Sequence, residues 1–286
     1  MAYRLSTLAD GRTVLLDDGL LEGESARWWD LGRLTDGRLA DPLDALADPA
    51  GLDALTDAAG VPHGDPDGEV ALGGLGPSVP RPRKVFGIGM NFGAHIAEMG
   101  RSAPAIPVIF TKWPNCLTGP GSDIVLVGDR TDYEVELVAV IGRTCRGLDP
   151  SEAWDALAGV AVGQDVSDRA LQLASSPPQF SLGKSHDTFG PLGPVTSLDL
   201  VDDPTDLTLH CSVDGEMRQD SHTSLMILDV PGLVAYLSEV CTLEPGDLVF
   251  TGTPSGVGDP QGRCLEVGQL VESEIPGVGR LANRCV

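Results

Sequence analysis

One predicted strand constrains the fold of this chain more than any other sequence feature, because it starts with two acidic side chains. Residues 135–142 are rich in apolar strand formers, and Glu134 and Glu136 stand at the start of this run. Side chains alternate between the faces of a strand, so both carboxylates lie on one face, about 7 Å apart. Two like charges at the start of a buried strand repel each other and are costly to desolvate. We therefore expect either a divalent cation between them or an edge strand that leaves both glutamates in water.

A third carboxylate, Asp165, ends another predicted strand. Residues 159–165 are small or apolar up to Gln164, and a helix start follows at 167–172. Asp165 is therefore either a third oxygen ligand or an ordinary helix N-cap. Mg²⁺ and Mn²⁺ prefer oxygen ligands and keep water molecules that a substrate can replace. Together with the glutamate pair, Asp165 predicts a divalent-cation site.

Two further segments carry residues suited to acid–base chemistry. His95 and Glu98 are three positions apart, so on a helix they face the same side. A carboxylate can orient an imidazole that accepts a proton from water, although a purely structural histidine is the alternative. Lys184, one of only three lysines among 19 basic residues, lies in the turn-rich segment 182–194. There its ammonium could hold a carboxylate or stabilise an enolate.

Charge and motif pattern disfavour several classes of function. The formal net charge of −23 repels phosphate backbones and anionic lipid, so we expect neither nucleic-acid nor membrane binding. The glycine-rich segment 251–258 lacks the Gly-Lys-Ser/Thr end of a phosphate-binding loop, so nucleotide binding is not supported. The backbone N–H groups of this segment could instead bind a substrate carboxylate.

The sequence also indicates a cellular compartment. No apolar run is long enough to span a membrane, and the first ten residues lack the apolar core of a secretory signal. The six cysteines are scattered without a Cys-x-x-Cys pair, which is typical of reduced thiols in a cytosol. We therefore predict a cytoplasmic protein.

Composition along the chain predicts a small domain followed by a larger one. Helical spacing over 42–59 and a strand near 13–16 lie in an acidic leading segment, and residues 60–83 are rich in Gly and Pro, which is typical of a linker. We predict domains at 1–75 and 84–286, the second rich in strands. Its predicted strands are 85–89, 107–112, 135–142, 159–165, 207–213, 247–252 and 270–275, with helices at 153–157, capped by Ser151, and 230–241.

Taken in chain order, these segments resemble the fumarylacetoacetate hydrolase family over 84–286. The matching segments are Gly89-Met90-Asn91-Phe92 with His95 and Glu98, Pro107 to Lys112 with Phe110, Glu134 and Glu136, Asp165 to Arg169, Lys184 to Asp187, and Gly252 to Gly258. Two positions depart from the family pattern: Phe92 replaces the usual tyrosine, and Gln164 replaces the usual asparagine. Neither departure removes a predicted ligand.

The resemblance implies a fold and a set of site residues. The fold would be α+β, a mixed β-sandwich or roll with a small N-terminal α+β domain. Mg²⁺ or Mn²⁺ would be held by Glu134, Glu136 and Asp165. The catalytic residues implied are His95 and Glu98 on a lid that activates water, and Lys184 beside the enolate; the substrate-binding residues implied are Lys112, Arg218, Gln219 and Thr253.

The resemblance also implies an activity. The chain would be a hydrolase that cleaves a C–C bond of a small 2,4-dioxo acid in catabolism and releases pyruvate through a metal-bound enolate. The same site would serve an oxaloacetate-type decarboxylase or a 2-hydroxyhepta-2,4-diene-1,7-dioate isomerase or hydratase, and we expect a homodimer by analogy. A non-enzymatic domain of this fold is a further alternative, which the retained acidic residues, His95 and Lys184 disfavour.

Overall fold

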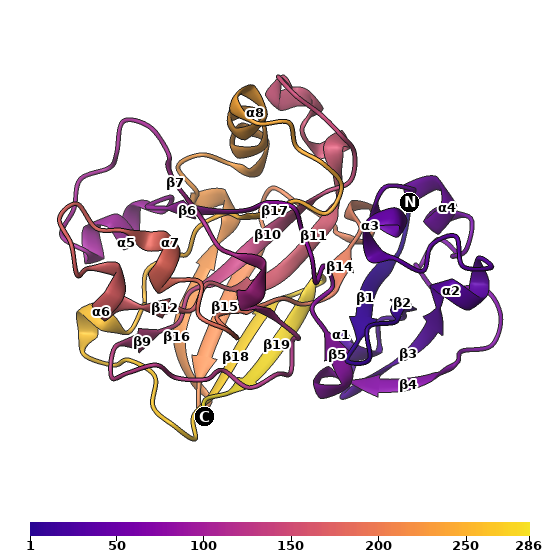
Figure 1. The fold of residues 1–286 in the computed structure, drawn as a ribbon, viewed down its shortest axis with the longest axis horizontal. Helices are drawn as coiled ribbons and strands as arrows, with labels where there is room; N and C mark the ends of the chain where they lie inside the picture. Colours follow the sequence, from indigo (N-terminus) through magenta and orange to yellow (C-terminus); the bar gives the residue numbers. More distant parts are fainter.

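The computed structural model of the protein describes the backbone of residues 1–286 and every side chain except that of Glu22. Two sheets dominate it, so the predicted α+β class is confirmed (Figure 1). The large sheet has 11 strands in the order β4-β3-β2-β1-β14-β11-β10-β17-β6-β7, with β5 paired to β1. Its strands are β1 (Arg4–Leu8), β2 (Thr13–Leu16), β3 (Ser25–Asp30), β4 (Gly68–Ala71), β5 (Leu75–Gly76), β6 (Val85–Gly89), β7 (Val108–Thr111), β10 (Val135–Ile141), β11 (Leu157–Gln164), β14 (Val195–Thr196) and β17 (Leu248–Phe250).

A second sheet of four strands packs against the middle of the first. Its order is β16-β15-β18-β19, formed by β15 (Thr208–Val213), β16 (Glu216–His222), β18 (Leu270–Ile275) and β19 (Gly279–Arg284). Two short pairs complete the strands: β8 (Leu117–Thr118) with β13 (Gly190–Pro191), and β9 (Thr131–Asp132) with β12 (Ser167–Asp168). Asp214 and Gly215 form the hairpin turn between β15 and β16, and both residues have the positive φ that such a turn requires.

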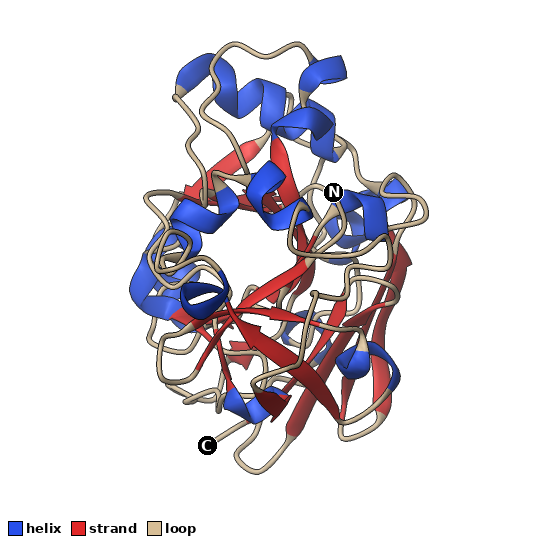
Figure 2. Cartoon of the chain, turned by 90° about the vertical axis from the view of Figure 1, so that its right-hand side faces the viewer, coloured by secondary structure: helices blue, strands red, loops and turns tan.

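Helices are short and lie around the sheets, as Figure 2 shows in blue. They are α1 (Gly19–Glu22), α2 (Leu31–Leu34), α3 (Pro42–Leu46), α4 (Pro49–Asp53), α5 (Gly93–Glu98), α6 (Arg169–Gln172), α7 (Phe180–Gly183) and α8 (Val230–Val240). The 3₁₀ turns are η1 (Leu72–Gly74), η2 (Pro114–Cys116), η3 (Pro150–Glu152), η4 (Trp154–Ala156), η5 (Leu198–Leu200), η6 (Thr223–Leu225) and η7 (Asp259–Gln261). Among the residues that the structure describes, no helix has the length and apolar character of a membrane span.

β10 and β11 lie at the centre of the molecule and are buried on both faces. Leu137 and Ala139 face the core under the four-stranded sheet, whereas Val138 and Val140 face the core shared with the N-terminal strands. This two-sided burial explains why both strands have nearly continuous apolar sequences. The face that carries Val138 and Val140 continues back to Glu136 and Glu134, so the alternation of the strand delivers both carboxylates to one side.

Three local predictions differ from the structure. The helical pattern over 42–59 forms two short helices, α3 and α4, because Pro49 starts a new helix and Asp48 caps it. The predicted helix at 153–157 is the 3₁₀ turn η4, and Asp149, instead of Ser151, makes the capping box of the preceding turn.

The predicted linker 60–83 is also structured in part, because β4 pairs with β3 and β5 pairs with β1. The N-terminal strands join the large sheet through β1, which pairs with β14 through Arg4 with Thr196 and Leu5 with Val195. One sheet therefore includes strands from both 1–75 and 84–286, and their division into separate domains stays a prediction.

Candidate active site

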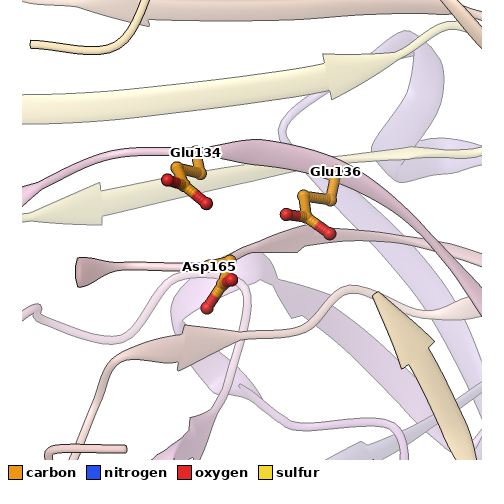
Figure 3. Close-up of side chains that lie close together, drawn as sticks. All are labelled: Glu134, Glu136 and Asp165. Atoms are coloured by element: carbon orange, nitrogen blue, oxygen red, sulfur yellow. The ribbon is translucent and has the colours of Figure 1, made fainter. Parts of the chain in front are cut away.

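Three acidic side chains converge where β10 begins and β11 ends. The antiparallel register pairs Val135 with Gln164, which places Glu134 beside Asp165, and the Asp165 N–H donates to the Glu134 carbonyl at 2.9 Å. One carboxylate oxygen from each of Glu134, Glu136 and Asp165 lies within 4.8 Å of the others. Figure 3 shows the three carboxylates gathered on one side of these two strands.

Burial decides between the alternatives left open by the sequence. Glu134, Glu136 and Asp165 are 5%, 1% and 0% exposed, so the glutamates do not lie on a solvated edge strand. The N-cap of α6 is Asp168, which accepts from the Leu171 N–H at 3.1 Å, so Asp165 does not cap this helix. The cluster is therefore a buried group of carboxylates.

Two lysine side chains bind the cluster directly. The Lys184 ammonium donates to Glu134 Oε2 at 2.7 Å and to Asp165 Oδ2 at 2.6 Å. The buried Lys112 ammonium donates to Asp165 Oδ1 at 2.7 Å, and also to the carbonyls of Lys184 and Phe189. These three acceptors use all the donors of Lys112, which favours a role in orienting Asp165. Substrate binding by Lys112 stays a prediction.

Asp132 links this cluster to two other segments. Its buried carboxylate accepts from Arg169 Nε at 2.9 Å and from the backbone N–H groups of Gly258 and Asp259 at 2.7 and 3.1 Å. Arg169 also lies 2.6 Å from Glu134 Oε1. The guanidinium is thus shared between Asp132 and Glu134, and the loop after β17 is tied to the start of β10.

The charges around the cluster leave Glu136 without a cationic partner. Burial alone would raise the pKa of Glu134, but Lys184 and Arg169 outweigh it and lower that pKa to about 2. For Glu136, burial and then the neighbouring Asp165 and Glu134 carboxylates raise the pKa well above its ordinary value. Among the described residues, the hydrogen-bond donor to the Glu136 carboxylate is the Gly252 N–H, which lies 2.8 Å from Oε2. An oxygen-only donor set with one uncompensated carboxylate fits a hard divalent cation.

Buried polar side chains fix the backbone that carries the two glutamates. Gln164 accepts from the Glu134 N–H at 2.8 Å and donates to Ser273 Oγ at 2.7 Å. Gln219 accepts from the Val135 N–H at 3.0 Å and donates to Thr253 Oγ1 at 2.8 Å. Gln164, which replaces the family's usual asparagine, therefore makes a hydrogen bond to the backbone at the start of β10.

His95 and Glu98 share the short helix α5, which packs against the loop after β17. His95 Nδ1 lies 3.4 Å from Glu98 Oε2, and the Gly256 N–H donates to Glu98 Oε1 at 3.1 Å. Burial would raise the pKa of Glu98, but its hydrogen bonds with His95 and Gly256 lower it overall. The helix is preceded by the buried Phe92, whose ring needs no hydrogen-bond partner where a tyrosine hydroxyl would.

A cavity of about 40 Å³ lies between α5 and the carboxylates. Four residues predicted from the sequence line it: His95, Glu134, Lys184 and Thr253. Its remaining lining is Ile88, Gly89, Met90, Met99, Arg101, Phe110, Arg169, Gln172, Leu173 and Phe180.

Three residues predicted to bind substrate, Lys112, Arg218 and Gln219, do not line this cavity. Lys112 and Gln219 are buried, and Arg218 lies 3.3 Å from Glu216 on β16. Their contact with a substrate stays a prediction.

Sequence reasoning assigned no role to Arg169 or Gln172, and both line the cavity. They stand three positions apart on α6, which begins four residues after Asp165, and Arg169 Nη1 donates to Gln172 Oε1 at 2.9 Å. Their spacing of three, which places both side chains on one face of a helix that follows the strand-end Asp165, is the sequence pattern that could have predicted them.

The charge imbalance predicts an effect of Glu136→Gln on stability. Because the pKa of Glu136 is raised in the folded state, its stabilising contribution is complete below the ordinary value of 4.5 and is lost as pH rises through the folded-state pKa. An amide stays neutral, so at neutral pH we expect metal-free Glu136→Gln to unfold about 2 °C or more above the metal-free wild type. The difference in unfolding temperature should vanish at pH 4. A Glu136→Gln variant that is less stable than the wild type at pH 7 would contradict this expectation, and thermal unfolding in EDTA at both pH values measures it.

Comparisons with known proteins place residues 84–286 in one family. These residues match the family described as "Fumarylacetoacetate (FAA) hydrolase C-terminal". A Burkholderia multivorans protein named as a hydrolase is 42% identical over 255 residues, which cover 85% of this chain and 90% of the relative. A crystal structure described as an HpcE protein from Mycobacterium smegmatis has a TM-score of 0.89 and 40% identity, and the alignment covers 99% of both chains.

Similar solved structures carry reaction names of two kinds. A fumarylpyruvate hydrolase from Pseudomonas aeruginosa, in complex with Mn²⁺ and pyruvate, is 31% identical with a TM-score of 0.65 over 78% of this chain and 93% of that one. A 5-carboxymethyl-2-hydroxymuconate delta-isomerase from Mycobacterium smegmatis is also 31% identical, with a TM-score of 0.73 over 100% of this chain and 98% of that one. Similar chains thus bear hydrolase and isomerase names.

Proposed function

The chain belongs to the fumarylacetoacetate hydrolase family, and on this premise we propose that it is a divalent-cation-dependent enzyme that hydrolyses a C–C bond of a small 2,4-dioxo acid and releases pyruvate. The observation that carries the proposal is the buried cluster of Glu134, Glu136 and Asp165 beside a cavity that His95 also lines. Mg²⁺ or Mn²⁺ held by these carboxylates would supply Lewis-acid polarisation of the 2-oxo group.

Lys184 is suited to stabilise the negative charge that develops on the substrate. Its ammonium lies between Glu134 and Asp165 and also faces the cavity. A fixed cation in a water-poor site stabilises an enolate oxygen far better than one in bulk water.

His95 and Glu98 are suited to activate the attacking water. With the Nδ1 proton directed to Glu98, the Nε2 atom of a neutral imidazole is free to accept a proton from water. Glu98 stabilises the imidazolium that results, and α5 places the ring of His95 in the lining of the cavity. The hydroxide adds to the 4-oxo carbon, the C3–C4 bond breaks to give a carboxylic acid and the enolate of pyruvate, and the imidazolium of His95 gives its proton to C3 of the enolate.

Isomerisation or decarboxylation is the second candidate, favoured by the similarity to the named delta-isomerase. These reactions also pass through an enolate, so the carboxylates and Lys184 would serve them equally. A hydrolytic water is the step that separates the candidates, and the His95–Glu98 pair favours hydrolysis. A homodimer stays a prediction from the resemblance, and a cytoplasmic location stays a prediction from the cysteine pattern and the N-terminal sequence.

A substrate panel with Mg²⁺ or Mn²⁺ tests the reaction class. We expect kcat/KM for pyruvate release from acylpyruvates or 2,4-diketo-3-deoxy sugar acids to exceed that for oxaloacetate and for a 2-hydroxy-2,4-dienedioate by at least about tenfold. The reason is that only the first two substrates use the water that His95 and Glu98 would activate. A coupled lactate dehydrogenase assay measures pyruvate. Turnover of the dienedioate without pyruvate release would instead establish the isomerase.

A further inference from the structure

The loop after β17 holds two carboxylates that belong to different parts of the site. The Gly252 N–H donates to Glu136 Oε2 at 2.8 Å, and the Gly256 N–H donates to Glu98 Oε1 and Oε2 at 3.1 and 3.2 Å. Glu98 Oε2 in turn lies 3.4 Å from His95 Nδ1. The position of this loop therefore sets where the histidine on α5 stands relative to the acidic cluster.

Gly256 occupies a place in this loop that only a glycine can take. Its φ is +107°, a backbone conformation that residues with side chains rarely adopt. A Cβ atom at this position would lie 2.1 Å from the Arg218 carbonyl oxygen on β16. The Arg218 backbone therefore blocks movement of Gly256 toward β16, and a second contact is needed to hold Gly256 against it.

The Tyr133 hydroxyl makes this second contact. It donates to the Gly256 carbonyl at 3.0 Å, and Tyr133 is 2% exposed. Tyr133 directly precedes Glu134, and the alternation of side chains sends its ring to the opposite face of the chain, into the core that also contains Val135 and Leu137. The same backbone segment thus delivers carboxylates to the site on one face and anchors the loop after β17 from the other.

We propose that Tyr133 is a positioning residue for the His95–Glu98 pair and acts on it through Gly256. The hydroxyl of Tyr133 holds the Gly256 carbonyl, the N–H of the same glycine holds Glu98, and Glu98 orients the imidazole. The proposal rests on the proposed function for what His95 does to water. The contacts that lead from Tyr133 to His95 do not depend on which reaction the site performs.

Steady-state kinetics of Tyr133→Phe test the assignment, because this change removes the hydroxyl and keeps the ring that packs in the core. We expect kcat for hydrolysis of an acylpyruvate to fall by about tenfold and KM to change by no more than about twofold, since the base is displaced but the acidic cluster is not. Oxaloacetate decarboxylation should fall by no more than about twofold. In the His95→Ala background, Tyr133→Phe should cause no further loss of hydrolysis, because the base on which it acts is already absent.

Tyr3→Phe is the matched control, because the buried Tyr3 hydroxyl also donates to a carbonyl, that of Ala158, and Tyr3 does not line the cavity. This variant measures what the loss of one buried hydrogen bond does by itself, and it should keep wild-type rates in both reactions. Equal losses of hydrolysis and decarboxylation in Tyr133→Phe, or a further loss in the His95→Ala background, would overturn the proposal. Loss of the fold in Tyr133→Phe, measured by circular dichroism, would overturn it as well.

Amide hydrogen exchange separates failure of this proposal from failure of the proposed function, because it needs no substrate. With Mg²⁺ present, we expect peptides from 93–99 and 252–259 to exchange about tenfold faster in Tyr133→Phe than in the wild type, whereas peptides from β10 should not change. Tyr3→Phe should exchange like the wild type in all three segments. Unchanged exchange over 93–99 in Tyr133→Phe overturns the role of Tyr133 even if a dioxo acid is hydrolysed. Faster exchange there in a protein that hydrolyses no dioxo acid overturns only the proposed reaction.

Discussion

Glu136→Ala is expected to abolish turnover while the protein remains folded. Glu136 is the carboxylate of the cluster that burial and its acidic neighbours leave without a cationic partner, so it is the group most dependent on a divalent cation. Loss of one of three ligands removes the Lewis-acid contribution, which is worth several kcal/mol, so kcat/KM should fall by about 10³-fold or more. Pyruvate release measures the activity, and circular dichroism with thermal unfolding measures the fold.

The control for this variant is Glu239→Ala, because Glu239 is an exposed glutamate on α8. It should keep wild-type activity. EDTA should reduce the wild type to the level of Glu136→Ala, and added Mg²⁺ or Mn²⁺ should restore only the wild type and Glu239→Ala. Full wild-type activity in EDTA would exclude a divalent-cation mechanism.

His95→Ala is expected to lower C–C hydrolysis by at least about 10²-fold, the usual contribution of a general base. Oxaloacetate decarboxylation by the same variant should fall much less, because no water has to be deprotonated in that reaction. The reason lies in the geometry: His95 Nδ1 is 3.4 Å from Glu98 Oε2 and the ring lines the cavity. Steady-state kinetics with an acylpyruvate and with oxaloacetate measure the two losses.

His63→Ala is the matched control for the histidine variant, because His63 is exposed and does not line the cavity. Neither activity should change. Glu98→Gln should reproduce part of the hydrolytic loss, since an amide orients the ring but stabilises its cationic form poorly. Equal losses of hydrolysis and decarboxylation in His95→Ala would refute the assignment of His95 to water activation.

Local sequence patterns predicted most of the central strands and the members of the acidic cluster. Alternation within one strand placed Glu134 and Glu136 on the same face, and the structure has them there. The small, apolar sequence up to Gln164 predicted a strand end at Asp165, and β11 ends at Gln164. These predictions succeeded because they depend on backbone geometry within a few residues.

Local patterns of this kind could not predict side-chain contacts between segments that are far apart in the sequence. Lys112 and Asp165 are far apart in sequence, so nothing local predicts that the ammonium binds this carboxylate and two carbonyls. The charge shared by Arg169 between Asp132 and Glu134 likewise depends on tertiary packing. Sequence reasoning therefore identified the acids and Lys184, but not the contacts by which Lys112 and Arg169 also balance the charge of the acids.

The pairing of β1 with β14 limits what can be inferred from composition. Gly and Pro between 60 and 83 indicated a break in the chain, but strands on both sides of it belong to one sheet. A change in composition marks where turns occur, whereas sheet pairing depends on which backbone edges meet in space. The linker pattern could not distinguish a domain boundary from a connection within one sheet.

Glu98 accepts the Gly256 N–H and also lies 3.4 Å from His95 Nδ1, so one carboxylate both fastens α5 to the loop after β17 and orients the histidine ring. If α5 swings away, the imidazole leaves together with its orienting partner. A state with α5 displaced would therefore be inactive. Small acids could enter and leave the cavity without meeting the oriented imidazole of His95. Formation of the hydrogen bond between Glu98 and Gly256 would then decide when the site is active, and no further group would be needed to control it.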